Sequence, residues 1–216
     1  MTDNPNKRLT VHVVCETHDD PGWLWTMDDY YMGTDGCKES VKRILDNMLI
    51  SLENNPNRKF TYVEVCYFKH WYQKLSEAKQ NLVKKLINEG RLELIHGGWV
   101  MHDEATSYYK HLIDNMRLGM KFLKEEFNVV PKIGWFIDPF GHSSATAHLL
   151  KQMNFDKIVL TRVSYQEKKY RRDKGNMEFI YNPFLIGKFL ILNLIKYPIL
   201  PVSLFWSSNN NWTKFY

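Results

Sequence analysis

The sequence predicts an α/β fold in which short parallel strands alternate with amphipathic helices. Five short runs are rich in apolar, β-branched or aromatic residues, and segments with apolar residues at helical spacing separate them. Polar residues cluster directly after four of these five runs. Strand–helix repetition is typical of a parallel sheet with helical crossovers, which is either a barrel or a doubly wound sheet. Because closing a barrel takes more than five strands, we expect a fold that is unfinished within this chain.

The first half of the chain contains two predicted strands and two predicted helices. Residues 9–14 form a short apolar run that predicts a strand. Residues 38–53 place their apolar side chains on one face of a helix. The run FTYVEVCYF at 60–68 is β-branched and aromatic, which predicts the second strand. A second helix is predicted at 77–89, and Gly90 suits the position just after its end.

The same alternation continues in the second half. A strand is predicted at 91–95, and a long helix follows at 105–127 with Asp103 as its N-cap. A strand at 132–137 ends at a proline. The remaining predicted elements are a helix at 143–153 and a strand at 157–161.

Composition excludes several classes of protein. The 216 residues are 44% hydrophobic and 25% charged, which is ordinary for a globular protein with a substantial core. The net charge of +5 is modest and no nucleic-acid-binding motif accompanies it, so we expect no nucleic-acid partner. Three cysteines without C-x-x-C spacing exclude a disulfide scaffold. Residues 1–8 are polar and show no signal peptide.

The character of the chain changes after residue 181. Residues 182–216 contain no Asp or Glu, and 183–206 are strongly apolar. A run of this length suits a membrane span, but two lysines, an asparagine and two prolines interrupt it, so a membrane span is the less favoured interpretation. We therefore expect a domain at 9–181 and a divergent tail at 182–216 that arises from truncation or mis-splicing.

The first polar cluster, CETHDDPGW at 15–23, directly follows the first predicted strand. In an extended backbone, residues two apart face the same way, so His18 and Asp20 can converge on one ion while Asp19 points elsewhere. An imidazole nitrogen and a carboxylate oxygen suit zinc, and Trp23 would form a wall beside the ion. A polar surface loop remains the alternative for this spacing taken alone.

The second polar cluster, WFIDPFGHS at 135–143, centres on Asp138. This carboxylate follows an apolar strand and has apolar neighbours, and a desolvated charge without a partner is costly. A helix N-cap is the alternative role, but Ser143 already serves it. A cation shared with the first cluster is the better explanation, and we expect His142 to support a neighbouring group.

Two further clusters complete the pattern. HGGWVMHDE at 96–104 follows the third predicted strand, and we favour structural roles for its histidines and acids. Arg162 follows the last predicted strand, where an arginine is either a plain surface residue or a hydrogen-bond donor to a carboxylate or a sugar hydroxyl. Because the carboxyl ends of parallel strands meet at one edge of a sheet, all four clusters are expected at that edge.

Four segments also occur together in one known family. They are HDDPGW (18–23), YVEVCYF (62–68), GRLELIHGGWVMHDEA (90–105) and IDPFGH (137–142). In this order they resemble glycoside hydrolase family 38, and the likeness is closest to its lysosomal acid α-mannosidase branch. The resemblance runs from residue 9 to residue 181. It implies a seven-stranded α/β barrel, incomplete in this chain, and a lysosomal or secretory-lumen location.

The resemblance also implies an activity: zinc-dependent hydrolysis, with retention, of the terminal α-D-mannosides of N-glycan oligosaccharides. Mapped by motif, the ligands of one Zn²⁺ ion are His18, Asp20 and Asp138, and Asp138 is also the nucleophile. The residues expected around the bound mannose are Trp23, Phe140 and Arg162. The last zinc histidine and the general-acid aspartate of the family lie beyond the resemblance. We therefore assign no general acid here and expect the isolated chain to be an incomplete, inactive portion of the enzyme.

Two other functions stay open from the sequence. One is a metal-dependent deacetylase or phosphoesterase on a similar barrel, in which zinc would activate water. The other is an inactive fragment or pseudoenzyme that acts only as a binding module. Metal analysis and the identity of the released product distinguish these functions from a mannosidase.

Overall fold

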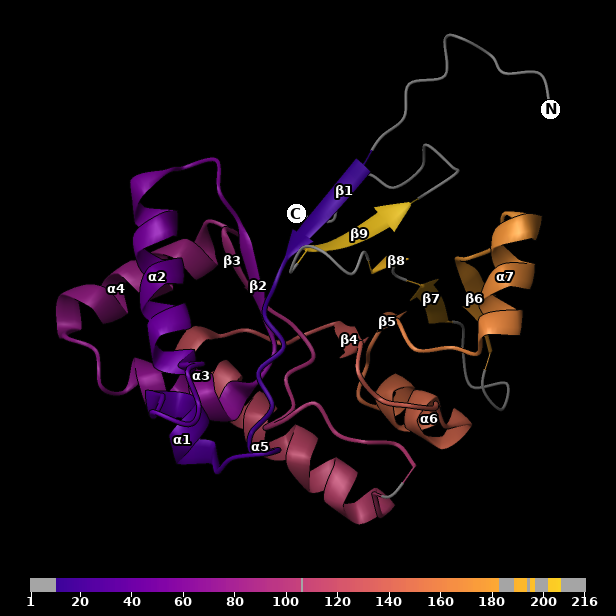
Figure 1. Cartoon of the computed structure of the whole chain (residues 1–216), viewed down its shortest axis with the longest axis horizontal. Coiled ribbons are helices and arrows are strands. Elements are labelled where there is room, and N and C mark those ends of the chain that lie inside the picture. The colour runs from indigo at the N-terminus through magenta and orange to yellow at the C-terminus, as the bar shows by residue number, and fades with distance from the viewer. Residues whose placement is uncertain (1–10, 106, 183–188, 194, 197–201, 207–216) are drawn as a thin grey trace, which may run out of the picture.

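The computed structural model describes residues 11–105, 107–182, 189–193, 195–196 and 202–206 (Figure 1). The helices are α1 (Met27–Met32), α2 (Val41–Asn54), α3 (Val65–Tyr72), α4 (Glu77–Asn88), α5 (Tyr109–Phe127), α6 (Ser144–Gln152) and α7 (Tyr165–Lys174). The strands are β1 (Val11–Cys15), β2 (Phe60–Tyr62), β3 (Leu92–Leu94), β4 (Ile133–Phe136), β5 (Lys157–Leu160), β6 (Phe179–Tyr181), β7 (Phe189–Asn193), β8 (Ile195–Lys196) and β9 (Val202–Trp206). Alternation of strands and helices therefore confirms the predicted α/β class.

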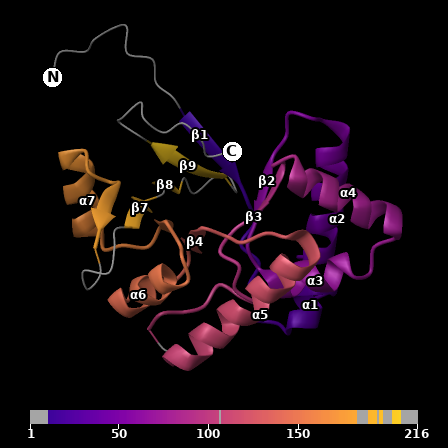
Figure 2. The same cartoon turned by 180° about the vertical axis from the view of Figure 1, so that it is seen from behind.

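The strands form three sheets. β2 and β3 pair in parallel, β4, β5 and β7 are parallel neighbours, and β6 joins β7 antiparallel. β1 pairs antiparallel with β9, which in turn pairs with β8. Helices occupy the crossovers between parallel strands, as such connections require. Figures 1 and 2 show α2, α3 and α4 grouped around β2 and β3, with α6 and α7 beside the β4 sheet.

The described strands do not show the predicted seven-stranded barrel. Among the described residues, the strands make three mixed or short sheets and no closed seven-stranded parallel barrel. The reason is pairing: β9 runs antiparallel along β1, and β6 runs antiparallel along β7, so the parallel order ends at both places. One backbone hydrogen bond, from His96 N to Ile133 O at 2.8 Å, connects the β2–β3 sheet to β4.

An inner apolar cluster holds the strands of different sheets together. Its buried members lie on β4, β5 and β7 or directly after β2, β3 and β4, and they are Val63, Ile95, Trp135, Ile137, Val159 and Leu192. A second cluster packs α2, α3, α4 and α5 on the outer face of β2 and β3, and a third packs α6 against β4 and β5. Because apolar side chains fill both faces, the ends of these strands are held in fixed positions.

Several element predictions were wrong at their boundaries or in type. The predicted strand at 60–68 is the three-residue strand β2 followed by helix α3. Nearly every residue of α3 is buried, so its apolar run carries no period that distinguishes a helix from a strand. Helix α5 begins at Tyr109 with Tyr108 at the N-cap position, so Asp103 is not its cap.

Helices α1 and α7 were not predicted. α1 begins with a capping box between Thr26 and Asp29. α7 has no buried residue, and the side chain of Ser164 caps it by accepting from Glu167 N. An ion pair between Glu167 and Arg171 at 2.7 Å supports it further. Local capping thus explains two helices that lack a clear apolar stripe.

The described parts of the apolar tail are the strands β7, β8 and β9, and the other residues of 183–206 lie outside the described residues. No helix in the described ranges combines the length and the apolar character needed to cross a bilayer. All three cysteines are free.

Candidate metal centre

The loops that follow β1, β2, β4 and β5 bring polar side chains to one place. His18 and Asp20 follow β1, Glu64 follows β2, Asp138 follows β4 and Arg162 follows β5. Contacts between their side chains bring these four loops together, and Glu64 was not among the predicted residues. Positions at the carboxyl ends of strands are the ones at which α/β folds hold their ligands.

His18, Asp20 and Asp138 form a compact set of metal-ligand atoms. The Nε2 atom of His18 lies 3.0 Å from Oδ1 of Asp20 and 3.4 Å from Oδ2 of Asp138. One ligand atom from each of the three residues lies within 4.8 Å of the others. Although both carboxylates are near, Nε2 has no aligned hydrogen-bond partner. The three side chains are therefore arranged as metal-ligand atoms around a common point rather than as a hydrogen-bonded pair.

The electrostatics of this cluster favour a positive charge between the acids. Burial lowers the pKa of His18, but the contact with Asp20 and the charges of Asp20 and Asp138 outweigh it, and the net pKa is raised. Burial raises the pKa of Asp138, but the hydrogen bond from Arg162 and the charge of His18 outweigh it, and the net pKa is lowered. Asp138 is therefore ionised near neutral pH, where it can bind a cation or act as a nucleophile.

A buried anchor fixes the loop that carries His18 and Asp20. The carboxylate of Asp19 points away from the other two and accepts hydrogen bonds from the Tyr62 hydroxyl at 2.9 Å and the Thr17 hydroxyl at 3.0 Å. Burial raises the pKa of Asp19. The Tyr67 hydroxyl donates to the carbonyl oxygen of Asp20 at 3.1 Å. This alternation, with His18 and Asp20 on one side and Asp19 on the other, follows the predicted pattern.

Arg162 holds the other oxygen of Asp138. Its Nε donates to Oδ1 of Asp138 at 3.0 Å, and a second guanidinium nitrogen donates to the same oxygen. The guanidinium carbon lies 4.6 Å from the centre of the Phe140 ring, as in a cation–π contact. Oδ1 of Asp138 is thus occupied by Arg162, and Oδ2 is left facing His18.

His142 lies between the Glu104 carboxylate and the backbone carbonyl of Arg162. Nδ1 of His142 lies 2.8 Å from Oε1 of Glu104, and Nε2 lies 3.0 Å from the carbonyl oxygen of Arg162. The other oxygen of Glu104 accepts from the backbone N–H of Ser143 at 2.6 Å, at the start of α6. Both partners of His142 are hydrogen-bond acceptors, and each ring nitrogen faces one of them. The supporting role predicted for His142 fits this arrangement.

The two aromatic residues of the prediction lie in different surroundings. Trp23 and Phe140 are both 74% exposed. Trp23 lines a cavity of about 610 Å³ that also reaches His18, Asp20 and Trp25. Phe140 is not among the residues that line this cavity and lies under Arg162 instead.

The two histidines of the cluster at 96–104 are buried and are not among the candidate metal ligands. His96 and His102 are nearly inaccessible, and their rings pack on Phe136. Burial lowers the pKa of His96 to about 3 and that of His102 to about 4. The backbone N–H of Trp135 donates to Nδ1 of His96 at 3.3 Å. These histidines are neutral packing groups, as the structural interpretation predicts.

Sequence reasoning missed Glu64. Its side chain is 1% exposed and lies 3.8 Å, by Oε1, from Nδ1 of His18. The available signal was a single acid inside the apolar run FTYVEVCYF, which was interpreted as a plain strand residue.

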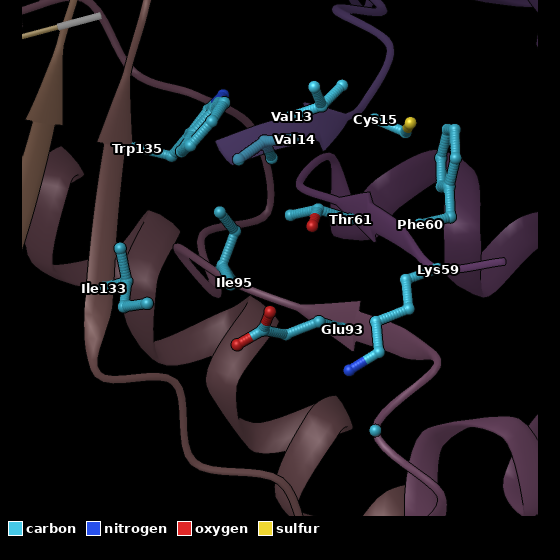
Figure 3. A pocket seen from close by; sticks show the side chains of 11 residues that line it. Val13, Val14, Cys15, Lys59, Phe60, Thr61, Glu93, Ile95, Ile133 and Trp135 are labelled. Atoms are coloured by element: carbon cyan, nitrogen blue, oxygen red, sulfur yellow. The ribbon is translucent and has the colours of Figure 1, made fainter. Parts of the chain in front are cut away.

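A second, smaller hollow lies away from this centre. It has a volume of about 90 Å³ between β1, β2, β3 and β4, and Figure 3 shows apolar side chains lining it together with Glu93 and Lys59. Burial raises the pKa of Glu93, although the charge of Lys59 opposes the shift. No residue predicted for the active site lines this hollow.

The chain is similar to known glycosidases. Residues 8–196 match the N-terminal domain of glycosyl hydrolases family 38. The sequence is 47% identical over 175 residues to the lysosomal alpha-mannosidase of Dictyostelium discoideum, covering 80% of this chain and 17% of that protein. It is 45% identical over 177 residues to the lysosomal alpha-mannosidase of Mus musculus, covering 80% of this chain and 18% of that protein. The chain thus spans less than a fifth of these relatives.

A solved structure shares the fold. The crystal structure of an alpha-mannosidase from Enterococcus faecalis V583 aligns with a TM-score of 0.65 at 18% sequence identity, covering 83% of this chain and 19% of that one. The match to the family domain also includes residues after 181, where the resemblance seen in the sequence alone ends.

Proposed function

Because the chain belongs to family 38 of the glycosyl hydrolases, we propose that it carries the metal-binding and nucleophile-bearing part of a retaining α-mannosidase. One observation carries the proposal: Asp138, from a distant part of the sequence, joins His18 and Asp20, and the three residues present ligand atoms within 4.8 Å of one another. The substrate we propose is a terminal α-D-mannoside of an N-glycan-type oligosaccharide. The lysosome or the secretory lumen is the proposed location, since relatives are named lysosomal alpha-mannosidases.

The donor set fits one zinc ion. Zinc accepts one imidazole nitrogen and two carboxylate oxygens at about 2.0–2.2 Å, which separates neighbouring ligand atoms by roughly 3–4 Å. The distances of 3.0 and 3.4 Å from His18 Nε2 to the two acids lie in this range. When bound, zinc would supply positive charge that can hold hydroxyl groups of the mannose ring. Three protein ligands leave a further position for another ligand or for substrate.

Asp138 is the proposed nucleophile. Its lowered pKa keeps it ionised, and Arg162 fixes the orientation of its carboxylate. The carboxylate would attack the anomeric carbon while the bond to the leaving oxygen breaks, and that oxygen must take a proton from an acid outside the residues assigned here. Water would then attack the same carbon and release Asp138, so that two inversions give retention. Trp23, Phe140 and Arg162 are proposed to line the mannose subsite. We assign no general acid among the described residues.

A glycosyl fluoride tests the nucleophile without a general acid. In 5-fluoro-α-D-mannosyl fluoride, Asp138 would form an ester bond to C1 while the C1–F bond breaks, and fluoride leaves with the electron pair and needs no proton. Digestion of the zinc-loaded chain followed by peptide mass spectrometry locates the adduct. We expect one sugar on the peptide that contains Asp138, and a chelator should abolish it.

Two variants control the labelling experiment. Asp138→Asn should leave the chain folded and unlabelled, whereas Asp114→Asn, on the exposed face of α5, should label like the wild type. A sugar attached to any other residue, or no adduct in a chain shown to hold zinc, would refute the assignment of the nucleophile.

A further inference from the structure

Glu64 is a buried carboxyl group with no hydrogen-bond partner for either oxygen. It occupies the N-cap position of α3, yet its side chain makes no cap hydrogen bond and turns inward. Only 1% of the side chain is exposed, so bulk solvent does not reach it. Buried polar groups are rarely left unpaired, and an acid at such a position calls for an explanation.

Glu64 lies beside the His18 ring, at the nitrogen that does not face Asp20 and Asp138. Oε1 of Glu64 lies 3.8 Å from Nδ1 of His18, and this nitrogen also lacks a hydrogen-bond partner. The two ring nitrogens therefore point to different acids: Nε2 points toward Asp20 and Asp138, and Nδ1 points toward Glu64. A shift of about 1 Å would bring the two unpaired groups to hydrogen-bond length.

We propose that Glu64 is a positioning residue that accepts the Nδ1–H of His18 and so presents the Nε2 lone pair to the metal. This inference rests on the proposed zinc site. A metal-bound imidazole must hold its remaining proton on the nitrogen that is not bound to the metal, and an acceptor there fixes both the tautomer and the orientation of the ring. A carboxylate acceptor also makes the imidazole a stronger ligand.

The Glu64 carboxyl group is buried and lies near other acids. Burial raises the pKa of Glu64 well above its usual range, and the charges of Asp19 and Glu16 raise it further. A positive ion on Nε2 of His18 would make its Nδ1–H a stronger donor to an acceptor at this position. An apolar residue would fill the same space between Val63 and Val65 at less cost, so the acid is better explained by its position behind His18 than by packing.

Zinc affinity of the full chain tests this role. Competition with a chromophoric chelator gives the dissociation constant for the wild type and for Glu64→Gln, which has the same shape and no negative charge. We expect the affinity to fall about 10- to 100-fold, with the thermal midpoint of the metal-free chain unchanged. Glu53→Gln, at an exposed position of α2, is the matched control and should bind like the wild type.

A second readout is specific to positioning. In ¹⁵N-histidine-labelled, zinc-loaded chain, the Nδ1 proton of His18 should resonate downfield as a donor to a carboxylate, and it should move upfield in Glu64→Gln. If Glu64→Gln does not fold, Glu64→Met, of similar size and without an acceptor, takes its place and should also bind zinc weakly. Unchanged affinity and an unchanged proton resonance in the folded variant would overturn the inference.

Failure of this inference is distinguishable from failure of the proposed function. If the wild-type chain binds zinc and His18→Ala abolishes binding while Glu64→Gln has no effect, only the role of Glu64 is overturned. If the wild-type chain binds no zinc, both the proposed metal site and the role of Glu64 are refuted.

Discussion

Replacing Tyr62 with phenylalanine tests whether the buried anchor of Asp19 organises the metal loop. The substitution removes one hydroxyl group, which donates at 2.9 Å to the Asp19 carboxylate in a site where Tyr62 is fully buried. A hydrogen bond to a charged group contributes about 1.5–3 kcal/mol, so we expect the free energy of unfolding to fall by about that amount. The hydroxyl of Thr17 remains as the other donor to Asp19.

Tyr62→Phe should also weaken zinc binding, because Asp19 lies between two of the proposed ligands. If one loop residue must then be ordered on binding, the cost is about 1–2 kcal/mol. That cost corresponds to a roughly 5- to 30-fold lower affinity.

Urea denaturation followed by circular dichroism measures the first effect, and calorimetric titration with zinc measures the second. Tyr170→Phe is the matched control, since Tyr170 lies exposed on α7, and it should change neither quantity. An unfolding free energy within about 0.5 kcal/mol of the wild type would refute the anchor. A loss of stability with unchanged zinc affinity would show that Asp19 stabilises the fold without organising the ligands.

Two further predictions concern stability. A Cβ atom on Gly119 of α5 would lie 2.6 Å from the Gly98 carbonyl carbon, so Gly119→Ala should destabilise the fold by about 3 kcal/mol. Gly141→Ala is the control, because a Cβ atom there meets nothing within 4 Å. Equal thermal midpoints for the two variants would contradict this packing. Because burial lowers the pKa of His96 to about 3 and of His102 to about 4, the unfolded chain binds more protons than the folded chain below about pH 6.5. The unfolding free energy should therefore fall as the pH is lowered from about 6.5 to 4, by up to roughly 1.4 kcal/mol per pH unit for each histidine. Urea titrations at several pH values in this range measure the slope. Replacing both histidines by asparagine should reduce it.

The arrangement of the site was largely predictable because it depends on a rule of topology. Each candidate, from His18 and Asp20 to Asp138 and Arg162, follows an apolar run at the carboxyl end of a strand. β4 and β5 are parallel neighbours, and this pairing brings Asp138 and Arg162 to the same edge. The opposite orientations of Asp19 and Asp20 were also predictable, since extended backbone alternates its side chains.

Features that depend on burial from all sides or on distant pairing were not predictable. Helix α3 is apolar on nearly every face, so the run at 60–68 showed no helical period, and Glu64 was taken for a strand residue. The same run could not indicate that this acid would face His18. Pairing of β1 with β9 joins the two ends of the described chain, and no local pattern in either strand specifies an antiparallel partner so far away.

X-ray absorption at the zinc edge of the zinc-loaded chain tests the central claim most directly. If His18, Asp20 and Asp138 hold one ion, the spectrum should show nitrogen and oxygen neighbours at about 2.0–2.2 Å and no sulfur, and Asp138→Ala should lose one oxygen neighbour. A sulfur neighbour at about 2.3 Å, or a spectrum that Asp138→Ala leaves unchanged, would contradict it.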